Sequence, residues 1–526
     1  MEEGGAWRVR DPLYAGLPGH RKALSAVWAA ARRVTQPNGH GGQPPCPTID
    51  PEDPVAEPAF DVLSPVDAQL WDWDTPETPM VMGNVCLFDG RPFFDESGNF
   101  RLADVRRSIE SRLHLVPRYR RRIVDVPLGR PILVDDPSFD IANHVQLLTL
   151  PEPGTEEQLK AAFAQVHEGL LDHSRPLWKI VFIQGLADGR VGMIQKIHHS
   201  PFDGATTVRI METLFDSEPK PKPAPPPPWH PQPAPQALQV VAENIRGSLQ
   251  AAWRLGTGPH GPSLSPRRLG RSVRTLAALR GFLPAPPTSL NGPIGPRRRF
   301  DWIHTTLPDV KCMRQQVTGS TLNDVMLTAV AEGLRELFLA RGEDVAHIRP
   351  RVFVPVDVRD EAGAEAGNVF SALVLPLPID EPDVVARLRV IANEMATLKS
   401  GHQTQAMRLA MNLSELIPPV LLAAGARQTH NRGMFMNLTV TNVPGPRREL
   451  YLLGAKMLEL NPMLPLGTGL TLNVAVESYV DRLSVGLCCD PEKVPDLDVF
   501  KRGVATALDE LLARAIRSPY RGKETS

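Results

Sequence analysis

The sequence predicts an α/β protein built from two mixed units that are joined by a long crossover. Three observations lead to this prediction. The chain has 526 residues, of which 42% are hydrophobic, so that two or three domains with sizeable cores are expected. Strand-like and helix-like segments are mixed without a regular βαβ period. A stretch dominated by proline, residues 218–237, favours an extended polyproline conformation and separates the two mixed regions.

These boundaries divide the chain into four parts. We expect an accessory or disordered extension over residues 1–57, which contains one short helical candidate at residues 21–33. A first folded unit is expected over residues 58–216, a linker that is first rich in proline and then rich in arginine over 217–289, and a second folded unit over 290–520.

The first unit contains a strand that leads directly into a helix. Residues 191–197 read as a mostly buried strand, and Val208, Met211 and Phe215 then recur at helical spacing. Between these two segments lies His198-His199-Ser200-Pro201-Phe202-Asp203-Gly204. The sequence therefore predicts a junction that presents two histidines where a strand becomes a helix.

The second unit shows four regular patterns. Residues 321–339 have the apolar spacing of a buried helix, with Ser320 or Thr321 available as the N-cap. Alternating valines over residues 352–358 predict a strand, in which Pro355 indicates an edge position or a bulge. The alternating segments 472–476 and 483–487 predict a hairpin with its turn at Asp481-Arg482, and residues 499–516 predict a final amphipathic helix.

Charge and cysteine content limit the partners and the compartment. The net charge is −1, yet residues 244–300 contain ten arginines and no Asp, Glu or Lys. Such a block favours anions such as lipid headgroups, cofactor phosphates or nucleic acid, although it can also be a solvated connector. No aromatic platform or recognition helix accompanies it, which argues against nucleic acid. Five cysteines without C-x-x-C spacing favour a reducing compartment.

Targeting signals are not evident in the sequence. The first residues lack the basic and apolar regions of a secretory signal, and the longest apolar stretch, residues 416–426, is far shorter than the ~20 residues of a membrane-spanning helix. We therefore expect a cytoplasmic protein that is not secreted.

The histidine junction admits several chemical interpretations. Neighbouring residues on a strand point to opposite faces, so His198 and His199 do not converge on a metal, and we expect none. No G-x-S-x-G elbow offers a nucleophile. One histidine can instead act as a general base while the other faces the core. From chemistry alone, two buried structural histidines and a turn-capping Asp203 remain an equal alternative. The G-x-G-x-x-G match at residues 256–261 follows no strand and contains Pro259, so we interpret it as a connector.

Several short motifs occur in an order that identifies a family. Besides the His-His-x-x-x-Asp-Gly junction they are Leu63-Ser64-Pro65-x-Asp67, Arg175-Pro176-Leu177-Trp178, Leu290-Asn291-Gly292-Pro293, Asn323-Asp324, Gly367-Asn368 and Asn442-Val443-Pro444-Gly445-Pro446. The set resembles the bacterial wax ester synthase/diacylglycerol acyltransferase family, within the coenzyme A-dependent acyltransferases. The resemblance implies two chloramphenicol-acetyltransferase-like domains with an active site in a tunnel between them.

The resemblance also implies roles for the residues that match these motifs. His199 is expected to be the general base that activates the acceptor hydroxyl for direct attack on an acyl-CoA thioester, and His198 to support it. Asp203 and Gly204 are expected to be structural at the site. Asn323 is the candidate donor to the oxyanion, with Asp324 supporting it, while ordinary helix capping by this pair remains the alternative. Pro176, Leu177 and Trp178 are expected either to pack or to line the acyl tunnel.

The implied reaction is esterification of diacylglycerol, of long-chain alcohols or of both, with acyl-CoA as co-substrate and no cofactor. The alternatives are acyl or polyketide transfer to another hydroxyl, or a non-catalytic protein that binds lipid inclusions. Arg267, Arg268, Arg271 and Arg274, interleaved with apolar residues, fit a segment that binds an anionic surface. We therefore expect peripheral attachment to the inner membrane or to lipid inclusions. One departure from the family is Val81, where relatives often have His after Pro-Met.

Overall fold

The strands form two six-stranded sheets and one small sheet. The computed structural model describes residues 60–126, 129–220, 225–236, 239–247, 284–357, 370–400 and 435–517. The expected N-terminal extension, the helical candidate at 21–33, the apolar stretch at 416–426 and the Gly367-Asn368 motif lie outside these ranges. The mixed sheets confirm the predicted α/β class.

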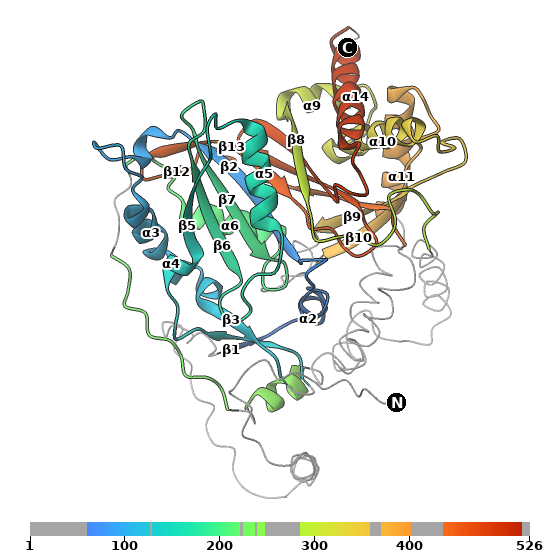
Figure 1. Ribbon diagram of the computed structural model, residues 1–526. Helices are drawn as coiled ribbons and strands as arrows, with labels where there is room; N and C mark the ends of the chain where they lie inside the picture. Colours follow the sequence, from blue (N-terminus) through green and yellow to red (C-terminus); the bar gives the residue numbers. More distant parts are fainter. Residues whose placement is uncertain are drawn as a thin grey trace, which may run out of the picture.

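The first large sheet has the order β12-β13-β2-β7-β6-β5 (Figure 1). Its strands are β12 (Tyr451–Leu452), β13 (Ala455–Met463), β2 (Val81–Phe88), β7 (Val191–His198), β6 (Trp178–Gln184) and β5 (Val145–Thr149). Only β5 and β6 pair in parallel. The two strands β12 and β13 come from the last quarter of the chain, so the C-terminal part of the sequence completes the N-terminal sheet.

Short helices and a small sheet surround this first sheet. The helices are α2 (Pro65–Asp72), α3 (Leu102–Glu110), α4 (Ile141–His144), α5 (Glu156–His167) and α6 (Gly204–Leu214), with the 3₁₀ turns η2 (Arg91–Phe93), η3 (Leu113–Leu115) and η4 (Pro117–Arg120). The small sheet has the order β1-β4-β3, formed by Phe60–Val62, Ile132–Asp135 and Arg121–Val124. The strand predicted at 191–197 and the helix after Gly204 are thus both present.

The second large sheet has the order β10-β9-β11-β14-β15-β8. Its strands are β10 (Phe370–Pro376), β9 (Arg351–Asp357), β11 (Leu438–Val443), β14 (Leu472–Tyr479), β15 (Arg482–Cys489) and β8 (Arg299–Thr306). The helices α9 (Leu307–Arg314), α10 (Leu322–Ala340), α11 (Val384–Ser400) and α14 (Leu497–Arg517) gather on one side of it (Figure 1). None of the helices within the described ranges is both long and apolar enough to cross a membrane.

The predicted elements of the second unit are present with two corrections. The hairpin forms with Tyr479 opposite Arg482, so its turn is Val480-Asp481 and not Asp481-Arg482; Val480 adopts φ 53° there. The strand that contains Pro355 lies between β10 and β11 and is not an edge strand. Strand β9 pairs with β11 only at Val352 and Phe353. Pro355 lies beyond this paired segment, so its missing N–H removes no hydrogen bond to β11.

The two halves of the molecule share a core. One hydrophobic cluster combines Val85, Leu159 and Phe163 of the first half with Phe300 and Trp302 of β8. Phe163 and Phe300 have ring centroids 4.4 Å apart. Because this cluster is continuous across both halves, the position of one sheet fixes the position of the other.

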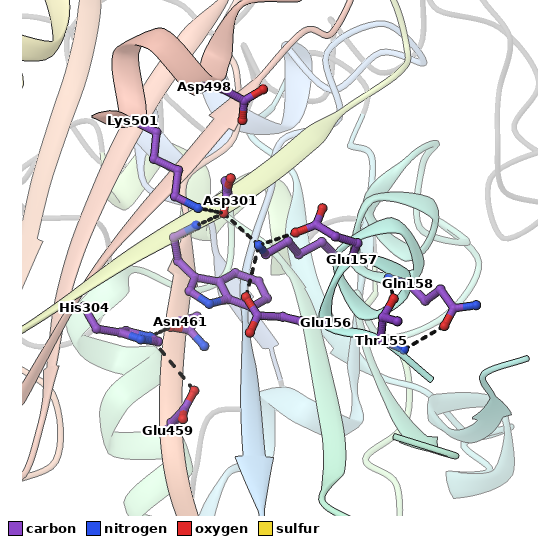
Figure 2. A network of polar contacts seen from close by, with 12 residues as sticks. Thr155, Glu156, Glu157, Gln158, Asp301, His304, Glu459, Asn461, Asp498 and Lys501 are labelled. Atoms are coloured by element: carbon purple, nitrogen blue, oxygen red, sulfur yellow. Dashed lines mark hydrogen bonds and ion pairs between the residues drawn. The ribbon is translucent and has the colours of Figure 1, made fainter. Parts of the chain in front are cut away.

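A buried charge network reinforces this shared core (Figure 2). The Nζ of Lys160 on α5 lies 2.9 Å from Oδ1 of Asp301 on β8, and the Nζ of Lys501 on α14 lies 2.8 Å from the same oxygen. Lys160 also pairs with Glu156 and Glu157 and lies 4.9 Å from the ring centre of Trp302. Burial would raise the pKa of Asp301, yet the two lysines lower it, so the carboxylate stays ionised between the halves.

The proline-rich part of the linker packs against the first half. The guanidinium of Arg120 lies 4.8 Å from the ring centre of Trp229, and the N–H of Gln232 donates to Oδ2 of Asp135 at 2.9 Å. Residues 239–247 are helical, and the buried Val240 packs among the valines of β3 and β4. Most of the arginine-rich segment, including Arg267, Arg268, Arg271 and Arg274, lies outside the described residues.

Candidate active site

The His-His junction lies where β7 ends and α6 begins. His198 is the last residue of β7, and Asp203 is the N-cap of α6, because its Oδ1 accepts a hydrogen bond of 2.7 Å from the N–H of Thr206. The backbone is fixed on both sides, since the N–H of His198 donates to Leu177 and the N–H of His199 donates to the carbonyl of Met80 at 2.8 Å. Asp203 therefore caps the helix through a backbone N–H group.

His198 is completely buried, and its Nδ1 is held by a hydrogen bond. Its Nδ1 accepts the N–H of Ser200 at 3.0 Å, which places the ring proton on Nε2, and Nε2 lies 3.5 Å from Oδ2 of Asp74. The ring also packs edge-on against Trp71. Burial lowers the pKa of His198, while the Asp74 carboxylate opposes that shift. These contacts agree with a supporting position in the core.

Asp74 is the residue at this site that sequence reasoning missed. Its side chain is fully buried; Oδ1 accepts the N–H of Met80 at 2.7 Å, and Oδ2 lies 2.8 Å from Nε2 of His173. Burial would raise the pKa of Asp74, but the hydrogen bonds from His173, His198 and Met80 hold it well below its usual value. No spacing distinguished Asp74 from Asp72 in the sequence, so only the folded arrangement identifies it.

His199 is half-buried and is the first residue of the turn that follows β7. Val81, the departure from the family pattern, lies directly beside His198 in the β2–β7 pairing. The described residues contain no group of three or more His, Cys, Asp or Glu side chains arranged to hold a metal ion.

Gly204 marks the point where the second half approaches the junction. A Cβ atom on Gly204 would lie 3.1 Å from Cγ2 of Val443, the last residue of β11. A Cβ on Gly445 would lie 1.8 Å from the carbonyl oxygen of Ser478. Both glycines are thus needed for close approach, and the Asn442–Pro446 motif is what packs beside the start of α6.

The described contacts of Trp178 are packing contacts. Its ring stacks on Tyr119 and His144, with centroids 4.4 and 4.5 Å away, and its Nε1 donates to the carbonyl of Tyr119 at 2.7 Å. Pro176 and Leu177 are buried too, and the Leu177 carbonyl accepts the N–H of His198. The motif therefore supports the strand beside the histidines, and its contribution to an acyl tunnel stays a prediction.

Asn323 and Asp324 take different positions at the start of α10. Thr321 is the N-cap, and Asp324 completes a capping box, because its Oδ2 accepts the N–H of Thr321 at 2.7 Å. Asn323 is not part of this cap, and its buried Oδ1 has no hydrogen-bond partner among the described residues. Helix α10 packs against α9, α11 and α14. No hydrogen bond within the described ranges joins Asn323 to His198 or His199.

A small cavity lies between the two halves, close to the end of β2 that carries Val81. It is lined by residues of both halves: Pro79, Val81, His167, Arg298, Phe300, Met463, Pro465 and Cys488.

Comparisons with known proteins agree along most of the chain. Residues 63–326 match the model of the wax ester synthase/diacylglycerol acyltransferase catalytic domain, and residues 366–512 match the model of the C-terminal domain of the same family. A probable diacylglycerol O-acyltransferase of Mycobacterium tuberculosis (strain CDC 1551 / Oshkosh) is 32% identical over 418 residues, which cover 77% of this chain and 87% of the relative. A putative diacylglycerol O-acyltransferase of Mycobacterium tuberculosis (strain ATCC 25618 / H37Rv) is 30% identical over 476 residues, covering 86% and 90%.

Solved structures show the same fold. A wax ester synthase/diacylglycerol acyltransferase from Marinobacter aquaeolei VT8 superimposes with a TM-score of 0.59 at 24% identity, covering 86% of this chain and 100% of that chain. A starter condensation domain mutant of rhizomide synthetase, solved in complex with C8-CoA, superimposes with a TM-score of 0.53 at 14% identity, covering 87% and 96%. Both likenesses confirm the predicted two-unit acyltransferase-type architecture.

Proposed function

The chain belongs to the wax ester synthase/diacylglycerol acyltransferase family and is an acyl-CoA-dependent O-acyltransferase, and we propose that it esterifies diacylglycerol, long-chain alcohols or both. The observation that carries the proposal is the junction itself. His199 directly follows His198, the last residue of β7, whose imidazole lies beside the buried, ionised Asp74. The names of the two mycobacterial relatives support diacylglycerol as an acceptor.

In the proposed reaction, His199 acts as the general base. An unprotonated ring nitrogen takes the proton from the acceptor hydroxyl while the hydroxyl oxygen forms a bond with the thioester carbon, which gives a tetrahedral oxyanion. Collapse of this intermediate breaks the carbon–sulfur bond, and the coenzyme A thiolate receives the proton from the imidazolium. These reaction steps require no covalent acyl-enzyme, and they use no cofactor besides the acyl-CoA substrate.

Asn323 is the proposed donor to the oxyanion. One observation supports this role: the side chain takes no part in the capping box of α10, so its Nδ2 group, which would donate to the oxyanion, is not used by that cap. Its buried Oδ1 is an acceptor and has no hydrogen-bond partner in the described part of the chain. A buried acceptor without a hydrogen-bond partner lowers the stability of the fold unless a ligand donates a hydrogen bond to it.

The proposed place of action is an anionic lipid surface to which the protein attaches peripherally. The arginines interleaved with apolar residues between 244 and 282 support this proposal, since each basic side chain near such a surface adds about 1 kcal/mol of attraction.

Replacing His199 is the direct test of the base. We expect His199→Ala to lower the rate of coenzyme A release from palmitoyl-CoA by about 10²–10⁴, with either dioleoylglycerol or hexadecanol as acceptor. His347→Ala serves as the matched control. His347 is exposed, and within the described residues its only ion pair is with Asp344. Release at the wild-type rate by His199→Ala, measured with a thiol reagent, would rule out the proposed base.

Asn323→Ala separates the oxyanion role from helix capping. Losing one oxyanion donor costs about 3 kcal/mol in the transition state, so kcat should fall by about 10²-fold. Thermal stability should hardly change, because Thr321 and Asp324 form the cap. Asp324→Ala is the comparison variant, and it should lower the melting temperature instead. If Asn323→Ala loses stability while kcat is retained, Asn323 is structural.

Flotation with liposomes tests the surface attachment. The full-length protein should float with anionic vesicles at low salt and lose this binding as the salt concentration rises, because exposed charges are screened. A variant that lacks residues 248–282 should stay in the bottom fraction. Equal flotation of both proteins contradicts the proposal.

A further inference from the structure

Glu477 is a buried carboxyl group that the proposed reaction does not use. It lies on β14, where the register pairs it with Val443 of β11 in parallel and with Ser484 of β15. Val474 and Val476 of the same strand belong to the core beneath the helices of the second half. Since successive side chains on a strand alternate, Glu477 points away from that core and toward the first half.

The neighbours of Glu477 lie at the active-site junction. Paired residues on adjacent strands place their side chains on the same face, so Glu477 and Val443 point the same way. Val443 is the residue that contacts Gly204 of the His-His-x-x-x-Asp-Gly junction. A Cβ on Gly445 would lie 3.3 Å from Cγ of Glu477, so the Asn442–Pro446 motif also packs on its side chain.

The carboxyl of Glu477 lacks a partner among the described residues. The residue is 7% exposed, and it has neither a hydrogen bond nor an ion pair within the described ranges. Ser484 lies opposite Glu477 in the hairpin, and its hydroxyl donates a hydrogen bond to Oδ1 of Asn461 instead. Burial raises the pKa of Glu477 to about 8, so near neutral pH the group is largely protonated and can donate its O–H.

A carboxyl that is only 7% exposed and that no described residue pairs loses most of its hydration, and an apolar side chain of similar size would avoid this cost. The feature is therefore best explained by a ligand that supplies the missing partner when it binds. The geometry limits that ligand to one that reaches the side of β14 on which Val443 of β11 approaches Gly204.

We propose that Glu477 determines acceptor specificity: its carboxyl forms a hydrogen bond with an oxygen of the acyl acceptor other than the reacting hydroxyl. This inference rests on the proposed function. Diacylglycerol carries ester carbonyl oxygens that accept such a bond, whereas a long-chain alcohol has only the hydroxyl that reacts. An acceptor without a second oxygen leaves the carboxyl unpaired, and sites built around a hydrogen bond discriminate against ligands that lack it.

The test compares two acceptors in four proteins: wild type, Glu477→Leu, Glu477→Gln and the surface control Glu492→Gln. The quantity measured is the ratio of kcat/KM for dioleoylglycerol to kcat/KM for hexadecanol, from coenzyme A release with palmitoyl-CoA. Glu477→Leu should lower this ratio about tenfold, as expected for one lost hydrogen bond. Glu477→Gln should keep most of the wild-type ratio, because the amide can still donate a hydrogen bond. Glu492→Gln should match the wild type, because the side chain of Glu492 is 56% exposed and pairs only with Arg297 in the described residues.

Each outcome has a distinct meaning. An unchanged ratio in Glu477→Leu, in a protein whose melting temperature is at least that of the wild type, overturns the role of Glu477 while leaving the proposed function intact. A wild-type protein that uses neither acceptor overturns the proposed function, and the role of Glu477 with it. A lowered ratio in Glu477→Leu that Glu477→Gln restores supports the proposal.

Discussion

The buried carboxylate of Asp74 is the contact on which the arrangement of the site depends. It lies in the turn before β2 and connects three parts of the first half: the backbone of Met80, the imidazole of His173 and the imidazole of His198. Burial would raise the pKa of Asp74, but these neighbours lower it, so the carboxylate stays ionised, with Nε2 of His198 3.5 Å from its Oδ2. His199 is the next residue, and its backbone N–H donates to the carbonyl of Met80, the residue whose own N–H bonds to Asp74.

The second constraint is the way the two halves are joined. Strand β13 completes the first sheet, the cluster around Phe163 and Phe300 is continuous across the halves, and Lys160 and Asp301 pair between them. At the junction, Gly204 has no Cβ, and this lets the side chain of Val443 lie close to the first turn of α6. The histidine junction of the first half therefore meets β11 of the second half, and Glu477 on the neighbouring strand β14 faces the same side as Val443.

Local patterns in the sequence were sufficient for the strand before the histidines, the helix after Gly204, the helix capped by Thr321 and the hairpin of β14 and β15. In each case the signal is the period of the apolar residues together with a cap or a turn. The ordered motifs were sufficient for the family. The crossing of β13 into the first sheet could not be predicted, because strand pairing over more than 250 residues leaves no local pattern. Asp74 and Glu477 were missed for the same reason: their roles come from neighbours that are distant in sequence. The turn at Val480-Asp481 was placed one residue late because its left-handed residue is a valine, which rarely adopts a positive φ.

The central claim is that Asp74 positions the histidine junction for acyl transfer, and kinetics of Asp74→Asn test it most directly. The asparagine keeps the size and can still accept the Met80 N–H, but it removes the charge that faces His198. We predict that kcat for acyl transfer to dioleoylglycerol falls by about 10²-fold, the lower end of what a positioned base contributes, while KM for palmitoyl-CoA stays unchanged. A variant that retains the wild-type kcat, or one in which kcat falls only in proportion to the loss of folded protein, would contradict the account.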